Sequence, residues 1–216
     1  MRRLPLLELF MVLGLFGGLL RASSAWPQPR ATIGKVTALE GKATVLRQGR
    51  FVPEPLADQE AIFQGDVIHT DVASKVRITL IDATVISLGE QSRLELNEFV
   101  YSSQQQTRTG RLAVPVGIFR AIVKKLIPQS AFEVTTPTAV AAIRGTDFMG
   151  EVKPDSTAMV VLEGTVVVSN VRAIFRGITT LLEGTGTTVT RDQPPTAPTR
   201  WSASRIDALQ RATALR

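Results

Sequence analysis

The chain has 216 residues, a formal net charge of +6, 44% hydrophobic residues, one histidine and no cysteine. This length suggests one domain with a short appendage, and the ordinary globular composition excludes collagen, coiled coil and wholesale disorder. The absence of cysteine excludes disulfide scaffolds, thiolate zinc sites, iron–sulfur clusters and a catalytic thiol. A single histidine also leaves little room for imidazole metal cages.

Residues 1–25 have the pattern of a secretory signal peptide. Arg2 and Arg3 precede an apolar run over residues 6–20, and small residues follow up to Ala25. The apolar run is shorter than the roughly 20 residues that a bilayer-spanning helix needs, which favours a cleaved signal over an anchor. We therefore expect Sec-type export, cleavage after Ala25, and a periplasmic or secreted protein.

The positive charge is not gathered on the part of the chain expected to fold. Five arginines lie after residue 190, whereas the bases of residues 26–190 are scattered singly among nearly as many acids. Nucleic-acid binding needs a clustered basic face, so no nucleic-acid partner is expected. The basic residues 200–216 are instead candidates for a weak contact with cell wall or anionic membrane.

Short runs of β-forming residues, separated by Gly, Asp or Asn, dominate from Ile33 onward. The tripeptide Leu-Glu-Gly recurs at residues 39–41, 162–164 and 182–184, each time between such runs. It suits a hairpin turn, and the 20-residue interval between the last two copies also suits stacked β coils. We expect an all-β fold, a solenoid-like or sandwich-like stack of short antiparallel strands. Its predicted strands lie at residues 33–36, 43–46, 76–80, 84–88, 93–96, 131–135, 159–162 and 165–168.

Several finer expectations follow from the same pattern. Residues 33–36 and 43–46 should form a hairpin, and the valines at 166–168 suggest a strand covered on both faces. Residues 102–110 are rich in Gln, Ser and Thr and are expected to form an exposed loop. Residues 118–127 fit either an amphipathic helix or a strand, and the sequence leaves this open.

The chain is expected to divide after the signal peptide into four segments. A β domain covers residues 33–170, and an additional β hairpin or coil covers residues 171–190. Residues 191–199 are rich in proline and suit an extended linker. Residues 200–216 suit a short C-terminal amphipathic helix, because apolar residues recur there at intervals of three.

The most distinctive stretch covers residues 132–148. Pro137 cannot donate a hydrogen bond to a sheet, so it should lie at a strand end or on an edge. Arg144, if buried, would need a carboxylate partner, and Glu133 and Glu163 are candidates. We favour an arginine that ties neighbouring coils together over an anchor for a ligand.

This stretch resembles the hallmark of the FecR domain family, Thr-Pro-x-Ala followed by Arg-Gly-Thr-x-Phe. The matching residues are Thr136, Pro137, Ala139, Arg144, Gly145, Thr146 and Phe148. The surrounding turns are also similar to those of the family, at Gly65, Asp66, Thr70, Asp82, Glu163 and Gly164. Residues 160–166 look like the closing hairpin of the family. Ala83 departs from the family pattern, which has glycine at that turn, so mild backbone strain is expected there.

The resemblance implies an extracytoplasmic all-β module of cell-surface signalling regulators, with an envelope protein as its probable partner. In the best-known members this module senses an outer-membrane siderophore transporter and regulates a cytoplasmic sigma factor. Those members carry a cytoplasmic anti-sigma region before a membrane helix, whereas only a few residues precede Leu6 here. We therefore expect a stand-alone exported FecR-domain protein that does not itself hold a sigma factor.

Few residues are candidates for a catalytic, metal-binding or nucleotide-binding site. His69 with Asp66 and Asp71 could form a metal or acid–base cluster, but metal sites usually have more ligands. Glu95 and Glu98 could act as paired carboxylates, although the aromatic platforms of a sugar site are missing. The glycines that follow Glu183 lack the remaining features of a nucleotide site.

We expect no catalytic residue, no cofactor and no metal. The preferred function is a non-catalytic protein-interaction or sensing module in the cell envelope, with an exposed edge strand as its contact. The alternative is an envelope-binding module that recognises peptidoglycan or glycan. A hydrolase that uses Glu95 or Asp82 is the third hypothesis.

Overall fold

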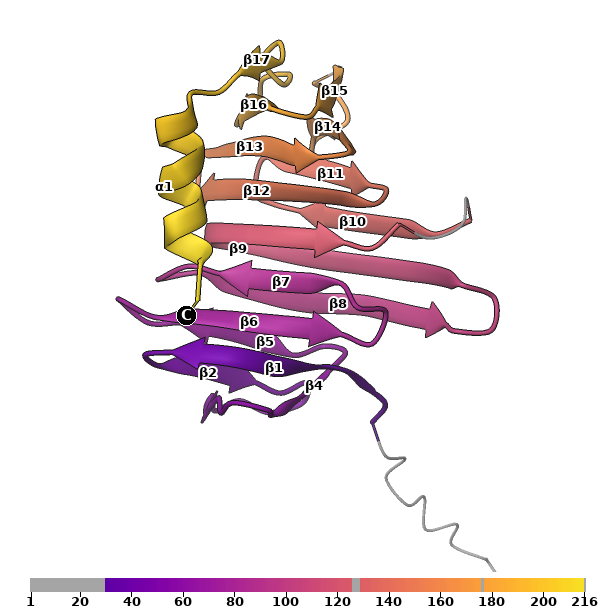
Figure 1. Cartoon of the computed structure of the whole chain (residues 1–216), viewed down its shortest axis with the longest axis vertical. Coiled ribbons are helices and arrows are strands. Elements are labelled where there is room, and N and C mark those ends of the chain that lie inside the picture. The colour runs from indigo at the N-terminus through magenta and orange to yellow at the C-terminus, as the bar shows by residue number, and fades with distance from the viewer. Residues whose placement is uncertain (1–29, 126–128, 176, 216) are drawn as a thin grey trace, which may run out of the picture.

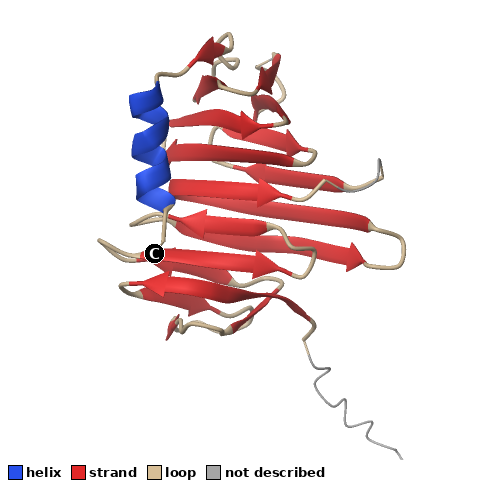
Figure 2. Cartoon of the chain, in the orientation of Figure 1, coloured by secondary structure: helices blue, strands red, loops and turns tan. Residues whose placement is uncertain are grey.

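The computed structural model describes residues 30–125, 129–175 and 177–215. Two β-sheets pack face to face, and one helix lies on the outer face of one of them (Figures 1 and 2). The all-β stack of antiparallel strands with a short C-terminal helix is thereby confirmed. The predicted signal peptide and its cleavage after Ala25 lie outside the described residues. Within them, no helix has both the length and the apolar composition to cross a bilayer.

The helix-side sheet is antiparallel throughout. From the lower end of Figure 1 its order is β4 (Ala61–Phe63), β1 (Thr32–Glu40), β6 (Lys75–Leu80), β7 (Val85–Leu88), β9 (Thr107–Val123), β12 (Thr146–Lys153), β13 (Ser156–Glu163), β16 (Thr185–Thr190) and β17 (Thr199–Arg200).

The far sheet lies behind it and shares β9 with it. Its order is β3 (Glu54–Pro55), β2 (Ala43–Leu46), β5 (Val67–Thr70), β8 (Arg93–Ser102), β9, β10 (Ala131–Thr135), β11 (Ala139–Ile143), β14 (Thr165–Asn170) and β15 (Ile178–Leu182). Its pairs are antiparallel except for β9 with β10, which run parallel.

Strand β9 bends from one sheet into the other. Its first part pairs with β8 and β10, and its second part pairs with β7 and β12. The bend lies at Gly117, which has φ of +108° and where a Cβ would collide with Ser92. Residues 118–123 are therefore strand. Their helical periodicity does not decide the structure, because strands on both sides take up their backbone hydrogen bonds.

The three Leu-Glu-Gly copies mark places where the chain crosses between the sheets. They connect β1 to β2, β13 to β14, and β15 to β16, and their glycines Gly41, Gly164 and Gly184 have φ of +77°, +89° and +75°. The strands that flank each copy do not pair with each other. The expected hairpins at residues 33–46 and 160–166 are therefore wrong. A glycine with positive φ serves a crossing as well as a hairpin, so the tripeptide alone does not distinguish them.

The core lies between the two sheets and is built from alternate residues of their strands. Phe119 and Phe148 meet edge to face at 5.6 Å between ring centroids, which is a favourable arrangement for aromatic rings. Val167 points out of the core and is 39% exposed, so the expectation that residues 166–168 are covered on both faces is wrong. Strand β13 is instead covered on both faces, because the core lies on one side of it and the helix covers its outer face.

Helix α1 (Ala203–Thr213) begins after Ser202, whose side chain accepts a hydrogen bond from the Arg205 backbone N–H. Its apolar side, with Trp201 before it, packs on the outer faces of β9, β12 and β13. Lys75 of β6 donates to the carbonyls of Arg211 and Ala214 at 2.7 and 2.8 Å. A cation at a helix C-terminus is favourable for the helix dipole, so Lys75 fastens the end of α1 to the sheet.

Residues 171–199 lie against the two sheets. Residues 171–190 contribute β15 to the far sheet and β16 to the helix-side sheet, and these two strands do not pair with each other. The proline-rich residues 191–199 begin with a turn and form no strand before Thr199, and they are held along β16. The N–H of Thr196 donates to the Thr188 carbonyl, and the N–H of Thr188 donates to the Thr196 hydroxyl, each at 3.0 Å.

A buried ion pair lies inside the stack. Arg108 of β9 contacts Asp82, and it also donates to the hydroxyl of Thr84 at 3.1 Å and to the carbonyl of Lys124 at 3.2 Å. Its guanidinium lies 4.9 Å from the centre of the Phe132 ring. Arg108 is 3% exposed, so the exposed loop expected at residues 102–110 is shorter than predicted.

We predict that Asp82→Ala lowers the free energy of unfolding by about 3–5 kcal/mol, because it leaves the Arg108 charge buried without its partner. The matched control is Glu98→Ala, which removes the exposed ion pair of Glu98 with Arg111 and should cost less than about 1 kcal/mol. Urea unfolding of both variants measures the difference. Equal losses would contradict this account.

Candidate interaction surface

The first part of the hallmark stretch forms a closed turn between β10 and β11. The Thr136 hydroxyl accepts a hydrogen bond from the Ala139 N–H at 2.9 Å, and the Thr136 N–H donates to the Ala139 carbonyl at 2.8 Å. The hydroxyls of Thr136 and Thr138 both contact the hydroxyl of Thr157 on β13, at 2.7 and 2.8 Å. These buried contacts tie a turn of the far sheet to the helix-side sheet. Pro137, at this turn, is exposed.

The second part of the stretch makes a crossing from β11 to β12. Gly145 has φ of +66°, and a Cβ there would lie 2.8 Å from the Cα of Lys125. Thr146 donates to the carbonyl of Thr165 at 2.9 Å. Arg144 is exposed and makes no ion pair within the described part of the chain, so the expected tie to Glu133 or Glu163 is wrong.

The sequence reasoning missed the ion pair of this stretch. Asp147 accepts two hydrogen bonds from Arg120 of β9, at 2.9 and 2.6 Å. The hydrogen bond to Asp147 raises the pKa of Arg120 above its ordinary value. Phe148, the next residue, is completely buried in the core. Apart from Pro137 and Arg144, the hallmark residues therefore serve core packing, the turn between β10 and β11, and the crossing from β11 to β12.

Thr70 of the first turn motif fastens another crossing. Its hydroxyl donates to the Gly89 carbonyl at 2.6 Å and accepts from the Ser92 N–H at 2.9 Å. These two residues belong to the crossing from β7 to β8. Gly65, in the same motif, has φ of +81°. Glu163 is exposed and precedes the Gly164 crossing.

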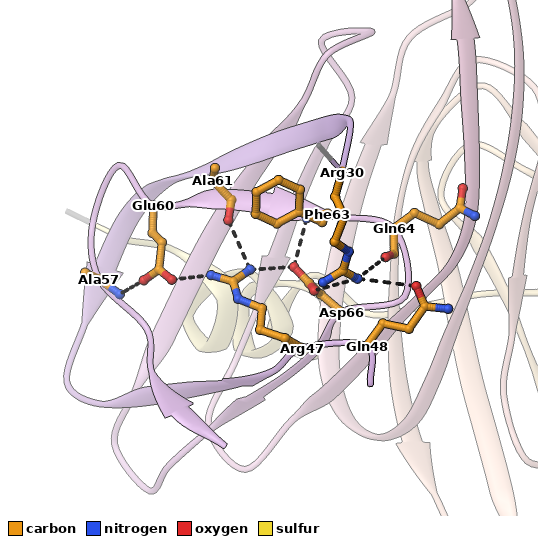
Figure 3. A network of polar contacts seen from close by, with 9 residues as sticks. All are labelled: Arg30, Arg47, Gln48, Ala57, Glu60, Ala61, Phe63, Gln64 and Asp66. Atoms are coloured by element: carbon orange, nitrogen blue, oxygen red, sulfur yellow. Dashed lines mark hydrogen bonds and ion pairs between the residues drawn. The ribbon is translucent and has the colours of Figure 1, made fainter. Parts of the chain in front are cut away.

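Asp66 is the centre of a polar network at the lower end of the stack (Figure 3). Its carboxylate is fully buried and accepts hydrogen bonds from the Phe63 N–H at 2.8 Å and from Arg47 at 2.6 Å. Arg47 also contacts Glu60 and the Ala61 carbonyl. This network holds the turn between β4 and β5 against β2.

The other carboxylate oxygen of Asp66 has fewer close partners. It makes no hydrogen bond among the described residues, and the guanidinium of Arg30 lies 3.8 Å away. Arg30 donates to the Gln64 carbonyl at 2.9 Å and to the Gln48 side chain at 3.3 Å, as Figure 3 shows. Arg30 therefore fastens the start of the described chain to this turn.

The acidic residues considered for catalysis are separated or neutralised. Glu95 pairs with Arg93 at 2.9 Å, and Glu98 pairs with Arg111 at 2.6 Å. Asp82 is committed to Arg108 inside the core. His69 is exposed on β5, whereas Asp66 is fully buried. Across the described residues, no three His, Asp or Glu side chains lie close enough to hold a metal ion.

The outer surface of the far sheet carries exposed apolar residues at its upper end. Ile178 and Leu182 on β15 are 76% and 59% exposed, and Val167 lies beside them on β14. A shallow hollow of about 530 Å³ borders this strand. It is lined by Val140, Ser169, Asn170, Val171, Ala173, Phe175, Gly177 and Ile178. We call these residues, together with Val167, Thr180 and Leu182, the β15 surface.

Strand β15 is also an edge strand, since it pairs with β14 and with no other described strand. The other edges are guarded in the usual ways, by short length or by proline. β4 has three residues and β17 has two, and β3 has two and contains Pro55. β15 has five residues, Ile-Thr-Thr-Leu-Leu, with no charge and no proline. Unlike the other three ends of the two sheets, this edge has no such guard along residues 178–181, whereas the N–H and carbonyl of Leu182 are already bonded to the Thr185 hydroxyl.

The described structure is an all-β stack without a cluster of reactive side chains, and part of it matches a known domain family. Residues 66–167 match the family model described as "FecR protein". Residues 66–167 therefore form a FecR domain, as the motifs indicate. A search among curated proteins gave no significant match.

Two solved structures share the fold. Both are crystal structures, at 2.50 and 1.65 Å resolution, of a proposed anti-sigma factor from Parabacteroides distasonis ATCC 8503. They are 18% identical to this chain, with TM-scores of 0.52 and 0.51, and each match covers 66% of this chain. The match covers only 62% and 63% of the solved chains, so this chain resembles part of each of them.

We predict that Gly145→Ala is far more destabilising than Gly49→Ala. Both glycines have positive φ, which costs a non-glycine residue about 1–2 kcal/mol. A Cβ at Gly49 would meet open space, whereas one at Gly145 would press on the Lys125 backbone. This overpacking adds about 1–3 kcal/mol, and thermal unfolding of the two variants measures it. Similar melting temperatures would refute the steric argument.

Proposed function

We propose that this chain is an extracytoplasmic, non-catalytic FecR-type module that senses or transmits a signal by binding a protein partner in the cell envelope. The observation that carries the proposal is the open edge of β15 with its exposed apolar residues. The FecR domain supports the regulatory class. The signal-peptide pattern of residues 1–25 supports the compartment.

The open edge suggests how a partner would bind. An extended partner segment adds to the far sheet beside β15, and main-chain hydrogen bonds supply affinity. Ile178 and Leu182 then contact alternate side chains of the partner, because alternate residues of a strand face the same side. The hollow beside Phe175 accepts one apolar side chain at the start of β15.

The proposal that the module is non-catalytic is supported by the ion pairs that its acidic side chains make. Asp82, Glu95 and Glu98 each have an arginine partner, which leaves none of them positioned as a free acid or base. Another hollow is lined by Lys125, Asp147 and Glu163, but Asp147 is held in an ion pair with Arg120. We therefore assign the β15 surface to contact with a protein.

The alternative role in cell-wall or lipid contact is less well supported. The apolar side of α1, with Trp201 before it, packs against the helix-side sheet, and Leu209 is 7% exposed. Arg205 stacks on Trp201, with its guanidinium 3.4 Å from the ring centre. This segment would have to leave the sheet before it could insert into lipid, so we do not propose that function.

We predict that the chain expressed in its host with its native start is processed to a mature form that begins at Trp26. Mass spectrometry of the envelope and cytosolic fractions measures both the N-terminus and the compartment. Recovery of the unprocessed chain in the cytosol alone would overturn the extracytoplasmic part of the proposal.

We predict that a photo-crosslinking phenylalanine analogue in place of Thr180 gives, in intact cells, an adduct with a different envelope protein. The same analogue in place of Val72 serves as the control, because Val72 is 66% exposed but lies outside the β15 surface. Adding Ile178→Lys to the position-180 variant should abolish the adduct while the protein remains folded by circular dichroism. An adduct that persists in that double variant, or equal adducts at both positions, would refute the assignment of this edge.

A further inference from the structure

The connection between β2 and β3 carries two adjacent apolar side chains that stand out in water. Phe51 is 97% exposed and Val52 is 73% exposed. Arg50 before them is also exposed and makes no ion pair within the described part of the chain. A hollow of about 390 Å³ beside them is lined by residues 49–52 and 54 alone, so no other described element covers them. We call residues 50–52 the loop tip.

The base of this connection is fixed to the rest of the fold. Arg47, at its start, is held by Asp66 and Glu60, as Figure 3 shows. The Arg50 N–H donates to the Arg47 carbonyl at 2.9 Å, and the connection ends in β3, which pairs with β2. Because both ends are fixed in this way, the apolar side chains of the loop tip are held away from the core.

The loop tip lies at the end of the molecule where the described chain begins. Arg30 donates to the Gln48 side chain at 3.3 Å, and Gln48 is three residues before Phe51. The apolar run of the proposed signal peptide ends at Leu20, and the ten residue steps from there to Arg30 span at most about 35 Å. During export, the lower end of the stack in Figure 1 is therefore the end tethered to the bilayer.

The β15 surface lies at the opposite end of the stack. In the far sheet β3 and β15 are the two end strands, and Figure 1 shows β15 at the top and β2 near the bottom. A molecule that rests on a membrane through its loop tip consequently presents β15 away from the lipid, where a partner protein can reach it.

We propose that Phe51 and Val52 insert into the surface of a phospholipid bilayer, with Arg50 at the level of the headgroups. Apolar side chains gain by leaving water for the boundary of the acyl chains, and a neighbouring cation is attracted to anionic lipid. A bilayer accepts a protruding ring without a matching cavity. Glu54 lies close to the base of the loop tip, so the apolar contribution is the larger one.

Two inserted side chains bury little area, so this contact is weak and reversible. It is separate from residues 200–216, because the apolar side of α1 stays on the helix-side sheet. The inference rests on the proposed function only for the export of the chain.

A fluorescent label tests insertion at the loop tip, because the chain has no cysteine of its own. Val52→Cys carrying an environment-sensitive dye should brighten with vesicles of equal parts phosphatidylcholine and phosphatidylglycerol, and nitroxide groups on the lipid chains should quench it. The matched control is Ile178→Cys, 76% exposed on the β15 surface, which should not respond. The dye reports only on its own position, so the test holds whether or not residues 1–25 have been removed.

A second substitution tests the contribution of the ring. At the lipid concentration that gives half of the full response, adding Phe51→Ser to the labelled Val52→Cys protein should reduce the response to about a tenth of its full value, since burial of a phenylalanine is worth about tenfold or more in affinity. Adding Ile178→Ser instead should leave the response unchanged. Both positions are exposed, so unchanged circular dichroism verifies that the variants fold.

The outcomes separate this inference from the proposed function. A dye at position 52 that does not respond to vesicles overturns the inference, even if the chain is exported and β15 captures a partner. A response that needs added envelope protein assigns the loop tip to a protein and overturns it as well, as do equal responses at positions 52 and 178. A response at position 52 alone that Phe51→Ser removes supports the inference, even if no envelope protein is captured at β15.

Discussion

The shared strand β9 is the constraint on which the two-sheet arrangement depends. It hydrogen-bonds to four other strands, two in each sheet, and it changes sheet at Gly117, where a side chain would collide with Ser92. Arg108, near its first residue, fixes its buried end to Asp82. Both sheets therefore extend outward from one continuous strand, and their faces are held together to form the core.

The chain crosses repeatedly between the sheets, and small polar groups satisfy the backbone at these crossings. Thr70 and Thr146 place hydroxyls at crossings, and Thr136 places one at the turn between β10 and β11, where sheet ladders leave carbonyls or N–H groups without partners. Two of these threonines belong to the FecR hallmark and the third to a turn motif. The conspicuous motif of the sequence is thus mainly a folding signature, whereas the contact surface that we propose lies outside it, on β15.

The sequence predicted the fold class, eight of the seventeen strands of the described residues and the C-terminal helix, because alternation and three-residue spacing are local signals. It did not predict which strands pair, because Gly41 and Gly164 serve a sheet crossing as readily as a hairpin. The partner of Asp82 was also missed, since Arg108 lies 26 residues away in a stretch that reads as polar loop. The open edge was not assigned to any strand, because exposure of Ile178 depends on what packs beside it.

The docking of α1 ties the last part of the described chain to some of the first. Lys75 reaches carbonyls more than 130 residues later, and Met149 and Val160 are covered only when Trp201 and Leu209 are in place. During synthesis the outer face of the helix-side sheet consequently stays bare until α1 has left the ribosome. The strands are thus made well before their cover, and a chain cut short before Trp201 would leave an apolar strip open to aggregation.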